Sequence, residues 1–191
     1  MSNKKEIIIK ATKLKKSFIT GDTEQTIFEN LDLNIYRGDF TVIMGSSGAG
    51  KSTLMYSLSG MDRPSSGDVV WNDKTITSLS DDRLAIFRRK NCGFVFQQIY
   101  LLDKMSLMDN VLTASALSGA SKKDSVKYAK ELFELVNIPE ITRKKFPSQV
   151  SGGEAQRAGI VRAEMCIRDR NYLAFTKNRI KDVYDKSHPR A

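Results

Sequence analysis

The chain of 191 residues is poor in the residues that stiffen or cross-link small proteins, with four prolines and two cysteines, Cys92 and Cys166. Two cysteines cannot form the disulfide framework of a small secreted domain, so we expect a reducing compartment. No apolar run approaches the roughly 18 residues that a membrane span needs. The early apolar run, Ile7 to Ile9, is too short for a signal peptide. These absences predict a soluble cytosolic protein.

The remaining composition fits one globular domain, because 40% of the residues are hydrophobic and 28% are charged. The net charge of +9 is compatible with binding to nucleic acid, to an anionic membrane or to an anionic small ligand. The lysines and arginines are spread along the chain, and neither zinc-finger spacing nor a basic aromatic strand of the RNA-binding kind occurs. We therefore expect no nucleic-acid partner.

Hydrophobic periodicity predicts a strand-rich beginning and a helical middle. Apolar and polar residues alternate over residues 6–36 around the turn Thr20-Gly21-Asp22, and residues 68–76 are expected to form a second hairpin around Asn72-Asp73. Residues 40–44 and 93–96 are expected to be short strands, and the first of these is expected to be buried on both faces. Apolar residues at three- and four-residue spacing predict helices over 51–59, 81–90, 106–117 and 122–136. This order indicates an α/β fold with a helical subdomain.

A phosphate-binding loop follows the expected strand at residues 40–44. It matches G-x-x-x-x-G-K-[ST] at every position: Gly45, Ser46, Ser47, Gly48, Ala49, Gly50, Lys51, Ser52 and Thr53. Glycines let backbone N–H groups turn toward phosphate oxygens, and the following helix adds its positive N-terminal end. Lys51 would contact the β- and γ-phosphates, and the Ser52 hydroxyl would bind Mg²⁺. The motif predicts a site for a nucleoside triphosphate and Mg²⁺.

A second motif begins a helix that we expect to reach Arg162, and it consists of Ser151, Gly152, Gly153 and Glu154. Ser151 and Glu154 alone would be explained as a capping box, in which each group satisfies the other's backbone N–H. The two intervening glycines would each cost roughly 1 kcal/mol relative to alanine inside a helix. Their presence indicates that a phosphate approaches the backbone at this helix N-terminus.

Together the two motifs resemble those of the nucleotide-binding domain of ABC transporters, whose Leu-Ser-Gly-Gly-Gln signature is here Val-Ser-Gly-Gly-Glu. The resemblance covers residues 6–163 and implies a P-loop NTPase core with an N-terminal antiparallel β region. It implies that Gln97 is the Q-loop glutamine, which contacts Mg²⁺ and the attacking water, and that Phe18 stacks on adenine. Phe18 can equally be an ordinary core or surface aromatic. Residues 60–67 and 97–102 most resemble the branch serving lipoprotein release, macrolide export and peptide-antibiotic resistance.

The resemblance also implies partners and a location. In this family the signature of one subunit closes on the γ-phosphate held by the P-loop of another, so we expect a homodimer of ATP-binding subunits. Closure moves integral membrane permease subunits, and the helical segment from about Leu101 to Leu135 would contact them. This arrangement places the protein in the cytoplasm, peripherally on the inner face of the cell membrane.

The chain departs from the family after the signature helix. A strand ending in Asp-Glu should follow, at about residue 174, but the residues there are Ala174 and Phe175. The nearest acid, Asp169, has no apolar run before it, and the later switch histidine is absent, because the only histidine, His188, lies near the terminus. These losses predict that the chain binds ATP and hydrolyses it poorly.

Residues 164–170, Glu-Met-Cys-Ile-Arg-Asp-Arg, mark the position of this break. They back-translate without mismatch to GAGATGTGTATAAGAGACAGN, which contains the transposon end AGATGTGTATAAGAGACAG used in sequencing libraries. The alternative is a genuine helical tail of mixed polarity. We interpret the chain as a chimera, with an incomplete ATP-binding domain over 1–163, an adapter scar over 164–170 and an unrelated or out-of-frame tail over 171–191.

Three functions are compatible with this interpretation of the sequence. The first is the ATP-binding subunit of a transporter, and the second is an ATP-binding regulator that does not hydrolyse. The third, a DNA-associated ABC ATPase, usually carries a long coiled coil between P-loop and signature, and the residues between Ser52 and Ser151 show no sustained heptads.

Overall fold

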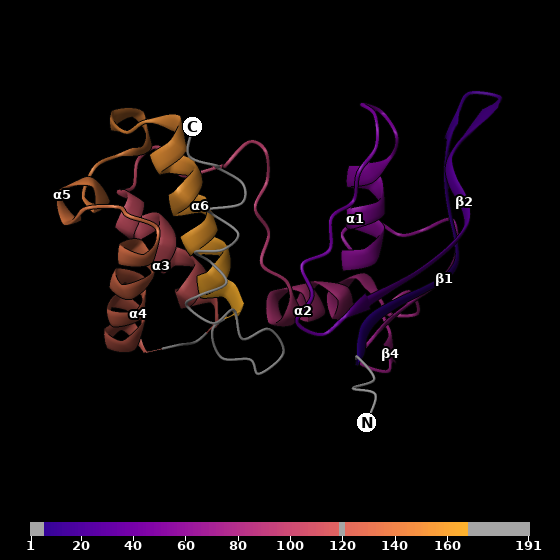
Figure 1. The fold of residues 1–191 in the computed structure, drawn as a ribbon, viewed down its shortest axis with the longest axis horizontal. Helices are drawn as coiled ribbons and strands as arrows, with labels where there is room; N and C mark the ends of the chain where they lie inside the picture. Colours follow the sequence, from indigo (N-terminus) through magenta and orange to yellow (C-terminus); the bar gives the residue numbers. More distant parts are fainter. Residues whose placement is uncertain (1–5, 119–120, 168–191) are drawn as a thin grey trace. The chain divides into compact units, whose positions relative to one another are not determined.

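The computed structural model describes residues 6–118 and 121–167 (Figure 1). The chain divides into two compact units, Met1–Arg88 and Arg89–Ala191, and the boundary falls inside the helix α2 (Asp81–Asn91).

The first unit is organised around a long antiparallel hairpin of β1 (Ile7–Thr20) and β2 (Thr23–Tyr36), as the alternating pattern predicts. The strand β3 (Ser66–Trp71) pairs with the other edge of β1, and β4 (Lys74–Thr75) pairs with β3. The sheet order is therefore β2-β1-β3-β4. Asn72 and Asp73 adopt left-handed backbone angles between β3 and β4, which confirms the predicted turn.

The helix α1 (Lys51–Ser59) begins and ends where the sequence predicts. Gly60 follows it with a φ of 68°, and the Gly60 N–H binds the carbonyls of Tyr56 and Ser57, so a glycine ends the helix. Leu54 and Leu58 are buried, and the Trp71 indole N–H donates to the Leu58 carbonyl at 2.7 Å. These contacts fix the phosphate-loop helix to the sheet.

The expected strand at residues 40–44 is not formed, and this prediction is wrong for the structure described here. Residues 39–46 have no regular secondary structure, and Phe40, Val42 and Met44 are 59%, 60% and 84% exposed. A strand buried on both faces needs hydrogen-bonding neighbours and covering layers. The sheet of the first unit, β2-β1-β3-β4, is antiparallel and provides no place for it.

The second unit is helical. Its elements are α3 (Leu107–Ser118), α4 (Lys122–Leu135), α5 (Glu140–Arg143), the 3₁₀ helix Pro147–Gln149 and α6 (Gly152–Ile167). Figure 1 shows α3, α4 and α6 side by side. Their inward faces form one apolar core, which contains Leu107, Val111, Ala129, Leu132, Phe133, Val136, Ile138, Ala158, Val161 and Met165.

The second expected strand, residues 93–96, is also wrong. The segment has no regular secondary structure and pairs with none of the described strands, and Val95 is 42% exposed. It lies instead along the end of α6, because a Cβ on Gly93 would stand 2.5 Å from the carbonyl oxygen of Ala163.

The helix α6 continues past Arg162, where the sequence analysis ends it, to Ile167. Met165 is fully buried in the core of the second unit, four residues after the buried Val161. The first residues of the predicted adapter scar, 164–167, therefore lie in a helix, whereas residues 168–170 and the predicted tail lie outside the described residues. Asp169, Ala174, Phe175 and His188 also lie outside them.

Candidate nucleotide-binding site

The phosphate-binding loop forms a tight turn before α1. Gly48 and Gly50 have φ of 80° and 78°, a left-handed conformation that favours glycine over other residues. Gly50 is favoured for a second reason, because a Cβ there would overlap Cγ2 of Ile27. Two of the loop's three glycines therefore stand where the backbone conformation favours glycine.

The Lys51 side chain folds back across this loop. Its Nζ donates to the carbonyl oxygens of Gly45 at 2.9 Å and of Ser46 at 2.6 Å. A lysine in this position places a positive charge inside the turn, where a phosphate group would enter.

A hollow of about 200 Å³ lies over the loop. It is lined by Ile27, Gly48, Ala49, Gly50, Lys51, Ser52 and Thr53. Ile27, from β2, is a residue that the sequence analysis missed, because nothing in the alternating pattern of β2 distinguishes it from its apolar neighbours. The hollow combines the positive N-terminal end of α1, one lysine and two hydroxyl side chains, which suits a phosphate group.

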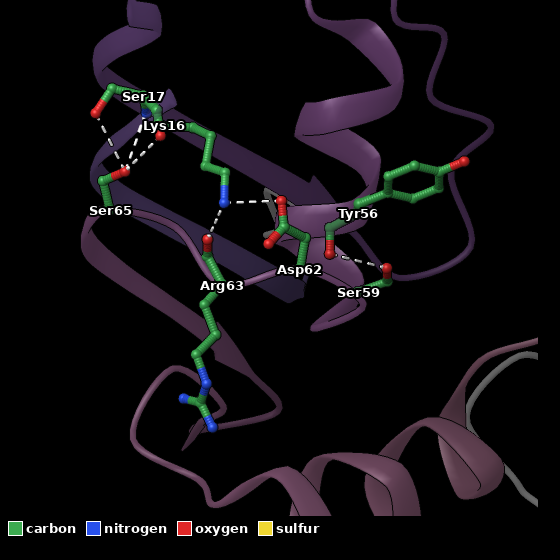
Figure 2. Close-up of polar contacts among 7 residues, drawn as sticks. All are labelled: Lys16, Ser17, Tyr56, Ser59, Asp62, Arg63 and Ser65. Carbon is green, nitrogen blue, oxygen red and sulfur yellow. Dashed lines mark hydrogen bonds and ion pairs between the residues drawn. The ribbon is translucent and has the colours of Figure 1, made fainter. Parts of the chain in front are cut away.

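A polar cluster fixes the far end of α1 to β1 (Figure 2). The Lys16 ammonium contacts the Asp62 carboxylate at 2.8 Å and donates to the Arg63 carbonyl at 2.7 Å. The Ser65 hydroxyl accepts from the Ser17 N–H at 3.0 Å and contacts the Ser17 hydroxyl. Lys16 is buried while the Asp62 side chain is 38% exposed, and the contact links β1 to the loop that follows α1.

Phe18 lies two residues further along β1, opposite Gln25. The Lys16 ammonium stands 4.8 Å from the centre of the Phe18 ring, and Phe18 is 43% exposed. The ring is therefore held by a cation on one side and remains accessible, which is compatible with stacking on a base.

In the second unit, the signature residues form the capping box that their spacing predicts. The Glu154 carboxylate accepts from the Ser151 N–H and from the Ser151 hydroxyl, both at 2.8 Å, and the Glu154 N–H donates to the Ser151 oxygen at 3.3 Å. The two hydrogen bonds from Ser151, with the charges of Arg157 and Lys145, hold the pKa of Glu154 below its ordinary value.

The glycines inside this box have no packing role. Among the residues that the structure describes, a Cβ on Gly152 would meet nothing within 4 Å, and one on Gly153 would meet the Arg157 guanidinium at an ordinary 3.5 Å. Both glycines are exposed, as is Ser151. The described residues of the second unit therefore leave space for a Cβ at both positions.

Gln97 also belongs to the second unit, and it is exposed. It follows Phe94 and Phe96, whose rings stack at 5.9 Å, while the Phe96 ring meets the Tyr100 ring edge-on at 5.9 Å. The aromatic contacts on either side of Gln97 order the short segment that carries it.

Within residues 6–118 and 121–167, no group of three or more histidine, cysteine, aspartate or glutamate side chains could hold a metal ion. The Ser52 hydroxyl lines the phosphate hollow, and Mg²⁺ characteristically combines few protein ligands with substrate phosphates. These residues therefore fit a Mg²⁺ ion that arrives with a nucleotide. No helix of the described part of the chain is long and apolar enough to cross a membrane.

Comparison with known proteins defines the class of this site. A family model described as ABC transporter matches residues 28–170, which include the phosphate loop, Gln97 and the signature. The chain therefore belongs to the ABC transporter family, as an ATP-binding domain with the P-loop fold.

Its relatives include proteins of the expected branch. The lipoprotein-releasing system ATP-binding protein LolD of Buchnera aphidicola is 38% identical over 82% of this chain and 68% of its own length. The macrolide export ATP-binding/permease protein MacB of Hahella chejuensis is 38% identical over 84% of this chain and 24% of its own length. The dimeric post-hydrolysis state of the ATP-binding cassette MJ0796, bound to ADP and Pi, aligns with a TM-score of 0.80 and 29% identity over 95% of this chain and 83% of that chain.

Proposed function

We propose that the protein binds Mg²⁺-ATP at its phosphate loop and couples this binding to a membrane permease. Lys51 would contact the β- and γ-phosphates, and Ser52 would bind Mg²⁺ beside Thr53. Backbone N–H groups of the loop would surround the phosphates, and they belong to Gly45, Ser46, Ser47, Gly48, Ala49 and Gly50. Gln97 would contact the same ion and the attacking water, and Phe18 would stack on adenine.

The geometry of Lys51 carries this proposal. Its ammonium is bound to the loop's own carbonyls, so it is already oriented into the turn before any phosphate arrives. A phosphate would replace these neutral acceptors with charged oxygens, which adds a Coulomb attraction to the ammonium.

ATP binding by the Lys51→Ala variant tests the proposal. The lost charge-assisted contact is worth roughly 1.5–3 kcal/mol, so we expect the dissociation constant for ATP to rise about ten- to hundredfold. Lys74→Ala is the matched control, because Lys74 is exposed on β4, outside the hollow. An unchanged dissociation constant in a folded Lys51→Ala variant would remove the phosphate-loop assignment.

A second copy of the chain is the proposed partner at the signature. Ser151, Gly152 and Gly153 are exposed at the beginning of the 16-residue helix α6, and the glycines leave open space there. The backbone N–H groups and the helix dipole at this end attract anions. We propose that they close on the γ-phosphate held by the partner copy.

The proposed permease contact lies on the helical unit, from about Leu101 to Leu135, and places the protein on the inner face of the cell membrane. Support comes from the relatives, because LolD is named as part of a lipoprotein-releasing system and MacB as a macrolide export protein with a permease part.

The chain as written is proposed to hydrolyse ATP poorly, because no Asp-Glu pair stands near residue 174. We attribute this to the chimeric junction at residues 164–170. The same observation favours one alternative, a regulator that binds ATP without hydrolysing it. The chimera hypothesis predicts that a version repaired across this junction recovers hydrolysis, whereas the regulator hypothesis predicts that it does not.

A further inference from the structure

The segment that carries Gln97 is fastened to the signature helix by one arginine. Arg162 projects from α6, and its two terminal nitrogens donate to the carbonyl oxygens of Ile99 at 2.7 Å and of Tyr100 at 2.6 Å. Tyr100 has a φ of 47°, which is unfavourable for a residue with a large side chain. The guanidinium fork therefore holds two successive carbonyls in a backbone conformation that the chain would otherwise avoid.

Two glycines let the same segment approach the helix closely. A Cβ on Gly159 would stand 2.7 Å from Cγ2 of Ile99, and one on Gly93 would stand 2.5 Å from the backbone oxygen of Ala163. Neither glycine is needed for its own φ, which is not in the left-handed region. Their role is the close contact between segment 93–100 and the last turns of α6.

We infer that Arg162 is a positioning residue for Gln97: it fixes the Gln97 segment to α6, so that Gln97 and the signature residues form one rigid body. The inference rests on the proposed function, because it matters only if Gln97 and Ser151 both act on nucleotide. Arg162 itself binds backbone carbonyls, and Gln97, two residues before the clamped Ile99, remains exposed for a ligand. The clamp would transmit displacement of either element to the other.

Amide hydrogen exchange of the full chain tests the clamp itself. We expect Arg162→Ala to accelerate exchange in residues 94–104 by about tenfold or more, because two charge-assisted hydrogen bonds are lost. Arg162→Lys, which keeps the charge and loses the fork, should be intermediate. Gly93→Ala should act like Arg162→Ala while Arg162 remains, and Arg83→Lys, an exposed change in α2, should have no effect. Unchanged exchange in both Arg162→Ala and Gly93→Ala would overturn the inference.

The effect on Gln97 is tested by ATP affinity in Mg²⁺ and in EDTA. We expect Gln97→Ala to reduce the ratio of the ATP affinity in Mg²⁺ to the ATP affinity in EDTA. Arg162→Ala should reduce this ratio equally, and the double variant should reduce it no further. The ATP affinity in EDTA should stay unchanged in all three variants. A mere loss of stability would lower both affinities together. Independent, additive effects of Gln97→Ala and Arg162→Ala would overturn the positioning role. No ATP binding by the unmodified chain would instead refute the proposed function and leave the exchange result standing.

Discussion

The Ser151 hydroxyl already has a partner in the protein, because it donates to the Glu154 carboxylate at 2.8 Å. To donate to a phosphate it must leave that carboxylate, whose lowered pKa keeps it ionised at neutral pH. Glu154 therefore orders the signature, and under the proposed function it would compete with the phosphate for the Ser151 hydroxyl. The proposed contacts of Gly152 and Gly153 use backbone N–H groups and would meet no such competition.

Gly152→Ala separates helix stability from anion binding. The added methyl group meets none of the described residues within 4 Å, and alanine is better than glycine in a helix by up to about 1 kcal/mol. We therefore expect a small gain in thermal stability. The same methyl group occupies the space proposed for the partner's γ-phosphate, so ATP-dependent dimerisation, measured by sedimentation, should weaken. A variant that dimerises with ATP as well as the unmodified chain would contradict this role.

Glu164 predicts a pH dependence of stability. Burial raises the pKa of its carboxyl, and the hydrogen bond from the Tyr128 hydroxyl at 3.3 Å only partly opposes this. Between the ordinary pKa and the raised one, the folded state holds more protons than the unfolded state, so the free energy of unfolding falls as pH rises. Above the raised pKa the full penalty is present.

Glu164→Gln should remove this penalty while keeping an acceptor for Tyr128. We expect its thermal midpoint to exceed that of the unmodified chain at about pH 8 and to match it at about pH 4, where both side chains are neutral. Glu140→Gln, at an exposed position on α5, is the control. A difference in midpoint that is the same at both pH values would show that charge is not its cause.

At the scale of elements, the segment 40–44 departs most from its sequence pattern. Phe40, Val42 and Met44 are exposed although the sequence of the segment predicts a buried strand. Unpaired backbone groups next to exposed β-branched residues favour association between molecules. The segment also leads directly into the phosphate loop, so its order affects the nucleotide site.

Met44→Lys tests whether this segment is unpacked. Because Met44 is 84% exposed, we expect the free energy of unfolding to change by no more than about 0.5 kcal/mol, and aggregation, followed by light scattering, to decrease. Leu14→Ala, at a fully buried position in β1, should instead cost about 2–5 kcal/mol. A cost for Met44→Lys comparable to that of Leu14→Ala would mean that the segment is buried in solution.

Local signals in the sequence predicted the elements that local interactions determine. The turn at Gly21, the helix ended by Gly60 and the Ser151–Glu154 box depend on residues a few positions apart, and all three are present. The strand at 40–44 was predicted wrongly, because a buried strand depends on neighbours that its own sequence does not contain. Ile27 over the phosphate loop and the fork of Arg162, 62 residues from Tyr100, were missed for the same reason.

Across the whole molecule, the groups proposed to act on nucleotide are divided between the units. The phosphate loop and Phe18 belong to Met1–Arg88, and Gln97 and the signature belong to Arg89–Ala191. Under the proposed function, the first set would bind phosphate and base, and the second set would supply groups toward Mg²⁺ and a partner's phosphate. Binding of ATP by the first set is therefore expected even where the acidic pair needed for hydrolysis is absent.

Mg²⁺-dependent phosphate release at saturating ATP tests the central claim most directly. It compares residues 1–191 with a version repaired from clean reads across codons 160–175. The missing acidic pair is expected to make the 191-residue chain at least about 10²-fold slower, while its Lys51-dependent ATP binding remains. Equal rates of phosphate release in the two proteins would contradict the account. The interpretation of the chain as a chimera would then be wrong, and another acidic residue, Asp169 before any other, would be catalytic.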